Sequence, residues 1–175
     1  MNGTTDLSYG RIYLDSNIVI SLALGDAGIE VSQLLLDMVA NVATSGRPPF
    51  GTSEFTLAES MVKAIRDGSE SDARTFENLI TTSAWLEVAA VDRNVLLWAA
   101  AARARYTHLK LPDAIHIASA FSLDCDCLLT ADAGIRGTYE FDAPEWAVRP
   151  SSVSIAVIRP TIADLQSIVA WVKEQ

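Results

Sequence analysis

The chain is poor in cysteine and has no long hydrophobic run. Its 175 residues include two cysteines, Cys125 and Cys127, whose C-x-C spacing has no matching ligand pair elsewhere. This excludes a disulfide framework and makes a zinc site a poor interpretation, so we expect reduced thiols. No apolar run reaches the roughly 18 residues that span a bilayer, and the N-terminal segment lacks the apolar core of a secretory signal. We expect a cytoplasmic protein without a membrane partner.

Basic residues are also scarce. Thirteen Lys and Arg stand against 22 Asp and Glu, which gives a formal net charge of −9 at pH 7. This balance excludes a protein that holds nucleic acid through a broad basic surface, so any contact with nucleic acid must be local. Half of the residues are hydrophobic, and the length suits one domain with a sizeable core. We therefore expect a single domain over residues 1–175.

Short apolar runs alternate with segments of helical periodicity. We expect strands at residues 12–15, 50–53, 85–91, 127–130 and 153–158. We expect helices at residues 31–43, 56–65, 69–82 and 93–106, from residue 111 onward, and at 162–172. This alternation predicts an α/β fold in which helices cover both faces of a mostly parallel, five-stranded sheet.

Four acids fall where predicted strands end or helices begin. Asp15 closes the run IYLD, Glu59 lies in TLAES, Asp113 opens PDAIHIA, and Asp132 follows CLLT. Because ligands of parallel sheets bind outside the carboxyl ends of the strands, we expect these four side chains to share one rim. Clustered carboxylates are stable only if some protonate or a cation joins them. The pattern therefore predicts a site for Mg²⁺ or Mn²⁺, ions that prefer oxygen ligands and serve phosphate chemistry.

Each acid also has a purely structural interpretation. Asp15 could form an Asx turn after its strand. Glu59 could complete a capping box with Thr56. Asp113 could stabilise the positive end of a helix dipole, and Asp132 could be a turn residue. A coincidence of all four at one rim is much less expected than any one of these alternatives.

The same motifs resemble the PIN-domain family, and within it the VapC-type toxin ribonucleases. The resemblance runs from about residue 11 to residue 136. The matching motifs are YLDSNIVI with Asp15, FTLAES with Glu59, LKLPDAIHIASA with Asp113, and DCLLTAD with Asp132. It implies a PIN-like three-layer α/β/α sandwich and a metal-dependent endoribonuclease that is commonly inhibited by a small antitoxin.

The resemblance also implies residue roles. Asp15 and Asp113 match the acids that touch the metal most directly, and Glu59 and Asp132 match those that complete the catalytic site. Two further positions, Asn17 and Thr130, match frequent polar supports. One departure is Ala131, where many relatives carry a polar residue.

Chemical reasoning from the residues agrees with these roles. An anionic phosphodiester would be repelled by carboxylates unless bound cations inverted the local charge, and a bound Mg²⁺ or Mn²⁺ would also activate water for attack. Arg136 could bind an RNA phosphate or lie in solvent. His116 lies three residues after Asp113, where a general-base role is conceivable, but a packed or hydrogen-bonded histidine is the favoured interpretation.

We therefore expect the toxin ribonuclease of a toxin–antitoxin pair, with RNA as substrate and an inhibitory antitoxin as partner. Apolar stripes at residues 31–38 and 56–65 could contact that partner, form a homodimer, or belong to the core. One alternative is an inert PIN-like binding or regulatory module, which Ala131 and the acidic surface favour. Another is a nuclease or phosphoesterase that acts on DNA or small phosphoesters.

Overall fold

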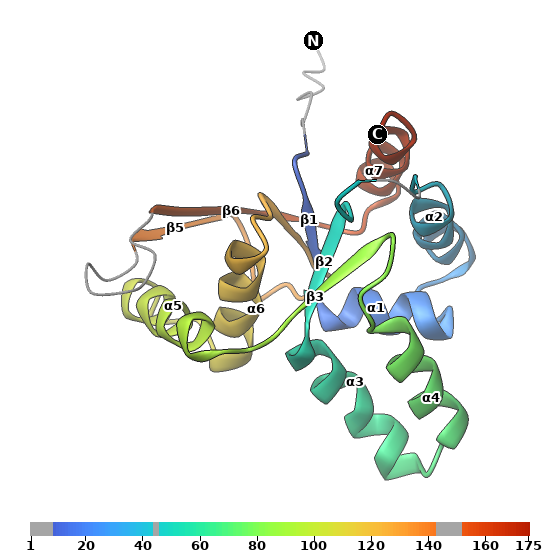
Figure 1. Cartoon of the computed structure of the whole chain (residues 1–175), viewed down its shortest axis with the longest axis horizontal. Helices are drawn as coiled ribbons and strands as arrows, with labels where there is room; N and C mark the ends of the chain where they lie inside the picture. Colours follow the sequence, from blue (N-terminus) through green and yellow to red (C-terminus); the bar gives the residue numbers. More distant parts are fainter. Residues whose placement is uncertain (1–8, 44–45, 143–151) are drawn as a thin grey trace.

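A six-stranded sheet forms the centre of the molecule (Figure 1). The structure is a computed structural model that describes residues 9–43, 46–142 and 152–175. Its strands are β1 (Ile12–Leu14), β2 (Phe50–Ser53), β3 (Leu86–Ala89), β4 (Cys127–Leu129), β5 (Thr138–Asp142) and β6 (Ser152–Ile158). The strand order is β3-β2-β1-β4-β6-β5. Every neighbouring pair is parallel except β5 and β6. The predicted α/β fold with a mostly parallel sheet is confirmed.

Helices cover both faces of this sheet. They are α1 (Ser16–Leu24), α2 (Ile29–Ala40), α3 (Glu54–Asp67), α4 (Glu70–Leu79), α5 (Arg93–Arg105), α6 (Leu111–Ser122) and α7 (Ile162–Lys173). Figure 1 shows α5 and α6 on one side of the sheet and the remaining helices on the other. The molecule is thus the expected three-layer α/β/α sandwich.

The central strands alternate their side chains between two hydrophobic clusters. Tyr13 of β1 packs in the cluster that contains α5 and α6. Its neighbours Ile12 and Leu14 pack in the other cluster, with α1, α2 and α7. All three side chains are completely buried. A strand that is covered on both faces needs apolar residues at successive positions, which explains why β1 has no polar alternation.

The prediction of five strands is wrong, because the structure adds β5 as an antiparallel edge strand next to β6. Its sequence alternates buried Tyr139 and Phe141 with exposed Thr138, Glu140 and Asp142. The pattern is that of a strand with one face in solvent, and it is only five residues long. Because β5 contains no continuous apolar run, the sequence pattern did not predict it.

Helix α1 was also not expected, because the polar residues after β1 resembled a turn. In the structure Asp15 is the N-cap residue of α1, and its side chain accepts a hydrogen bond from the backbone of Ser16. The strand therefore passes directly into a helix. Other boundaries follow their sequence signals: Gly68 ends α3 in the left-handed conformation with φ 65°, and Thr161 caps α7.

The parallel strands bring several polar residues to one edge of the sheet. Asp15 follows β1, Ser53 ends β2, Thr130 follows β4, and Arg159 follows β6. Helices α1 and α3 begin at this carboxyl edge. The fold therefore gathers residues from distant parts of the chain at the place where ligands of parallel sheets bind.

The helices of the described residues are short. No single one is long and apolar enough to cross a bilayer, and α1 and α2 reach that length only as a pair bent by 101°.

Candidate metal centre

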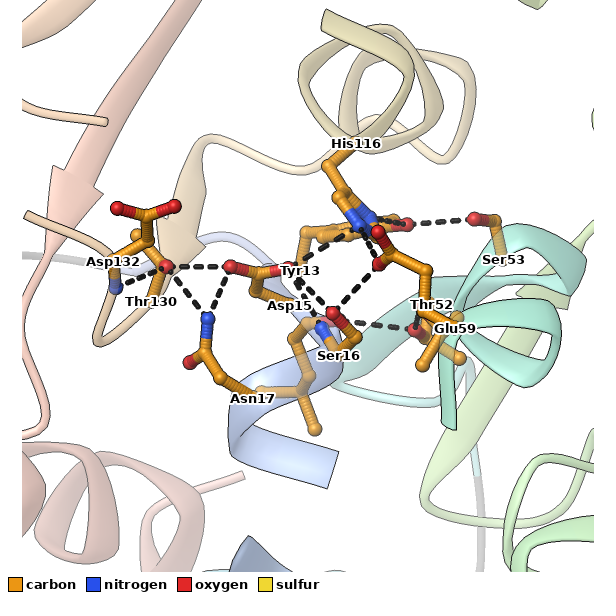
Figure 2. Close-up of polar contacts among 12 residues, drawn as sticks. Tyr13, Asp15, Ser16, Asn17, Thr52, Ser53, Glu59, His116, Thr130 and Asp132 are labelled. Carbon is orange, nitrogen blue, oxygen red and sulfur yellow. Dashed lines mark hydrogen bonds and ion pairs between the residues drawn. The ribbon is translucent and has the colours of Figure 1, made fainter. Parts of the chain in front are cut away.

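Asp15 is buried, with 3% of its surface exposed, and it is held by donors on both carboxylate oxygens. Oδ1 accepts a hydrogen bond of 2.7 Å from the backbone N–H of Ser16. Oδ2 accepts one of 2.5 Å from Asn17 Nδ2 and another of 2.5 Å from Thr130 Oγ1 (Figure 2). A buried carboxylate is costly unless it is hydrogen-bonded. The contact with Thr130, 115 residues away, exceeds what a local Asx turn requires.

Asn17 and Thr130 connect the segment after β1 to the segment after β4. Asn17 Nδ2 donates to Thr130 Oγ1 at 3.1 Å, and its Oδ1 accepts from the backbone N–H of Ala131 at 2.8 Å. Both side chains thus contact Asp15 and link the two segments to each other. Ala131 contributes only its backbone here, so this contact does not need a polar side chain at that position.

Glu59 on α3 reaches the same group of side chains. Its Oε2 accepts a hydrogen bond of 2.7 Å from Ser16 Oγ and lies 2.8 Å from His116 Nε2. His116 Nε2 also lies 3.2 Å from Asp15 Oδ1. One ligand atom from each of Asp15, Glu59 and His116 lies within 4.8 Å of the others. We call these three side chains the candidate metal centre.

The capping-box alternative for Glu59 is wrong. Helix α3 begins at Glu54 and its N-cap residue is Ser53, so Thr56 lies inside the helix. The hydroxyl of Thr56 accepts a hydrogen bond from Thr52 Oγ1. Partial burial acts to raise the pKa of Glu59, but the hydrogen bonds from His116 and Ser16 outweigh it and hold the pKa below its ordinary value.

Asp113 lies in the first turn of α6 and is partly exposed. Partial burial raises its pKa, and the negative charges of Asp132 and Asp15 raise it further, while the backbone and the charge of Lys110 oppose the shift. The charges of Asp132 and Asp15 therefore both act on Asp113. Asp113 is nevertheless outside the group of atoms that lie within 4.8 Å.

Asp132 lies in the exposed segment after β4. Its Oδ1 accepts a hydrogen bond of 2.7 Å from the backbone of Gly134, and its own N–H donates to Thr130 Oγ1 at 3.0 Å. The turn interpretation thus describes its local contacts, and its charge acts on Asp113 as well. Arg136 follows on the same loop and is exposed. Its backbone N–H bonds to the hydroxyl of Tyr139.

Apart from the charge of Lys110, which acts on Asp113, few cationic side chains offset the acids at this edge. Within residues 9–43, 46–142 and 152–175, neither Lys nor Arg forms an ion pair with Asp15, Glu59, Asp113 or Asp132. Uncompensated carboxylates attract cations, and oxygen-rich ligand sets suit divalent ions. The donor chemistry at this edge therefore fits a divalent metal ion.

The sequence did not reveal three of the contacts that organise this edge. Ser16 bridges Asp15 and Glu59 through its hydroxyl. His116 faces both carboxylates, although its spacing from Asp113 suggested only a shared helix face. Arg159 donates to the backbone carbonyls of Thr130 and Asp132, at 3.0 and 2.5 Å, and to that of Ile135. Only the contact of Ser16 had a signal in the sequence, because Ser16 directly follows the acid that ends β1.

Known proteins share this architecture. The PIN domain family model matches residues 12–140. A chain of a toxin–antitoxin complex from Klebsiella pneumoniae is 25% identical with a TM-score of 0.50, over 69% of this chain and 86% of that one. No curated protein matches the sequence.

Two further solved structures are similar in fold. VapC20 from Mycobacterium tuberculosis, a toxin that cleaves the sarcin-ricin loop, is 18% identical with a TM-score of 0.54, over 70% of this chain and 90% of that one. VapBC2 from Rickettsia felis, bound to a DNA fragment from its promoter, is 14% identical with a TM-score of 0.51, over 69% of this chain and 87% of the matched chain.

Proposed function

Because the chain belongs to the PIN domain family, we propose that it is an endoribonuclease that hydrolyses RNA phosphodiesters with the help of Mg²⁺ or Mn²⁺. The observation that carries this proposal is the gathering of acids from four separate segments at one edge without a Lys or Arg ion pair in the described residues. Such a site repels an anionic substrate by itself and becomes a substrate site when a cation is present.

Asp15, Glu59, Asp113 and Asp132 would hold the ion. When bound, the divalent ion supplies positive charge opposite a phosphodiester and lowers the pKa of a water molecule. The protein's own residues hold these acids in place: Asn17 and Thr130 fix the carboxylate of Asp15. Arg136, which is exposed on the same loop as Asp132, would contact an RNA phosphate.

We further propose that the protein is the toxin of a toxin–antitoxin pair. The support is its similarity to the toxin–antitoxin complex from Klebsiella pneumoniae and its fold, which it shares with VapC20 and VapBC2. Apolar side chains are exposed separately on α2 and on α3, and each helix offers contacts to an inhibitory protein: Ile29 and Leu36 on α2, and Val62 and Ile65 on α3. The homodimer and the cytoplasmic location stay predictions.

An inert binding module is the second candidate. It is favoured by the position of Asp113 and Asp132 outside the group of ligand atoms within 4.8 Å. The two candidates differ in a cleavage assay with purified protein, in which RNA, single-stranded DNA and a generic phosphoester are offered side by side with Mn²⁺, Mg²⁺ or EDTA. Metal-dependent cleavage of RNA alone supports the ribonuclease, and cleavage of the other substrates identifies a broader phosphoesterase.

The decisive variants are Asp15→Asn and Asp113→Asn, with Asp26→Asn as the matched control. Asp26 is an exposed acid in the segment between α1 and α2. The rate of RNA cleavage by each site variant should fall by about 100-fold or more, because the substitution removes a negative charge that binds the ion. The control should keep wild-type activity. Full metal-dependent cleavage by either folded site variant would refute the proposed function.

A further inference from the structure

His116 belongs to the candidate metal centre but is not one of the four acids proposed to hold the ion. It is 2% exposed on α6. Its Nε2 lies 2.8 Å from Glu59 Oε2 and 3.2 Å from Asp15 Oδ1, so one ring nitrogen contacts two carboxylates from two different elements (Figure 2). Both carboxylate oxygens are hydrogen-bond acceptors. An N–H at Nε2 would therefore complement them by donating to both.

The other ring nitrogen of His116 is held from behind. Nδ1 lies 3.0 Å from the hydroxyl of Tyr13, which lies 2.8 Å from Ser53 Oγ. Tyr13 is completely buried, and burial raises the pKa of its hydroxyl, which therefore keeps its hydrogen. The ring is also packed edge-on against Phe55, with 5.3 Å between the ring centroids. Hydrogen bonds and packing thus leave the imidazole little freedom to turn.

These contacts form one directed chain. If Ser53 Oγ–H donates to the Tyr13 hydroxyl and the Tyr13 hydroxyl donates to His116 Nδ1, the ring proton is placed on Nε2. That proton then points at Glu59 and Asp15. The chain links β2, β1 and α6 to the acids on α3 and at the start of α1.

We propose that His116 is a positioning residue, whose Nε2–H holds the carboxylates of Glu59 and Asp15 at a fixed separation for a divalent ion. This inference rests on the proposed function. A partner that orients metal-binding carboxylates reduces the reorganisation that binding requires, and its loss typically weakens metal affinity about 10- to 100-fold. Tyr13 and Ser53 act one step further back, by fixing the tautomer and the plane of the ring.

A different role would make His116 itself a metal ligand. The two roles differ in their effect on ion preference, because an imidazole nitrogen binds a transition-metal ion such as Mn²⁺ better than it binds Mg²⁺, although both ions favour oxygen ligands. A positioning residue that acts on two oxygen ligands should affect both ions by a similar factor. Loss of a nitrogen ligand should weaken Mn²⁺ binding far more than Mg²⁺ binding.

The test is calorimetric titration of the full chain with Mg²⁺ and with Mn²⁺. We expect His116→Ala to lower the binding affinity for Mg²⁺ and for Mn²⁺ by the same factor, within the range of about 10- to 100-fold. His116→Gln should recover part of the affinity, because its amide N–H can reach the same acceptors, and Tyr13→Phe should show a smaller loss. The matched control is His108→Gln, which changes the other, exposed histidine and should bind as wild type.

A second measurement needs no variant. Nitrogen-15 NMR of the imidazole rings in the metal-free wild-type protein should show His116 protonated at Nε2, with Nδ1 as an acceptor. The opposite tautomer, unchanged affinity in a folded His116→Ala, or a loss confined to Mn²⁺ would overturn the positioning role. If the wild-type protein binds neither ion, the proposed function fails instead, and the NMR tautomer still decides whether the hydrogen-bond chain exists.

Discussion

Asp15 is the most deeply buried acid at the carboxyl edge, and its stability there depends on a few named donors. Thr130 is central because its hydroxyl donates to Asp15 Oδ2 and accepts from Asn17 Nδ2 and from the N–H of Asp132. It is completely buried, so water cannot replace it. The Thr130 hydroxyl thus joins Asp15, Asn17 and Asp132 through three hydrogen bonds.

We predict that Thr130→Val, which keeps the shape and removes the hydroxyl, lowers the free energy of unfolding by about 1 to 3 kcal/mol, because buried partners lose their hydrogen bonds. Urea unfolding followed by circular dichroism measures this change. Thr138→Val on the exposed face of β5 is the matched control and should unfold as wild type. An equal effect of the two substitutions would show that Thr130 does not support Asp15.

Glu59 and Asp113 should respond to pH in opposite directions. The pKa of Glu59 is lowered in the fold, so its charge stabilises the protein above its ordinary value of 4.5, and this contribution disappears as the pH falls through the lowered pKa. The pKa of Asp113 is raised above its ordinary value of 3.8. Its contribution is therefore present at low pH and is lost as the pH rises through the raised pKa.

In metal-free buffer at pH 7, we therefore predict that Glu59→Gln destabilises the protein and Asp113→Asn stabilises it. Both differences in stability from the wild-type protein should shrink as the pH falls below the ordinary pKa values of the two side chains. Urea midpoints at pH 7 and near pH 3.5 measure them. Changes of the same sign in both variants at pH 7 would contradict the electrostatic arrangement described for this edge.

At the scale of single elements, the loop between β4 and β5 depends on a residue from another part of the chain. Arg159, directly after β6, donates to backbone carbonyls of Thr130, Asp132 and Ile135. It lies outside the matched range 12–140. Arg159 in the C-terminal segment thus holds the backbone around Asp132 in place.

Arg159→Met should release this loop. We predict a loss of about 1 to 3 kcal/mol in the free energy of unfolding, since hydrogen bonds from a charged donor are removed. Faster proteolysis within residues 130–136 should accompany it. Arg136→Met, which changes an exposed arginine on the same loop, serves as the control and should leave both properties unchanged. Wild-type protease resistance of Arg159→Met would show that the loop is held by other contacts.

The sequence predicted elements whose signals are local. The apolar run IYL indicated β1, and helical periodicity indicated the starts of α6 at residue 111 and of α7 at residue 162. It did not predict α1, because Asp15 and its polar neighbours look the same in an Asx turn and in an N-cap. The contacts of His116 and Arg159 could not be predicted either, because they depend on how helices and strands far apart in sequence pack together.

At the scale of the whole molecule, the net charge of −9 opposes binding to RNA. The protein should therefore depend on a divalent ion for substrate binding as well as for catalysis. We predict no measurable RNA binding in EDTA and restored binding in Ca²⁺, an ion that accepts the same oxygen ligands. Fluorescence anisotropy with a short labelled RNA measures both. Tight binding in EDTA would show that RNA contacts a surface other than the carboxyl edge.

The most direct measurement is the anomalous difference map of a crystal soaked in Mn²⁺. Carboxylate oxygens should lie about 2.0 to 2.3 Å from the ion. We predict one peak at the carboxyl edge, with Asp15 bound directly and Asp113 bound directly or through a water molecule, and with His116 still hydrogen-bonded to Glu59. A soaked crystal without a peak there, or with Asp15 and Asp113 too far apart to share an ion, would contradict the account.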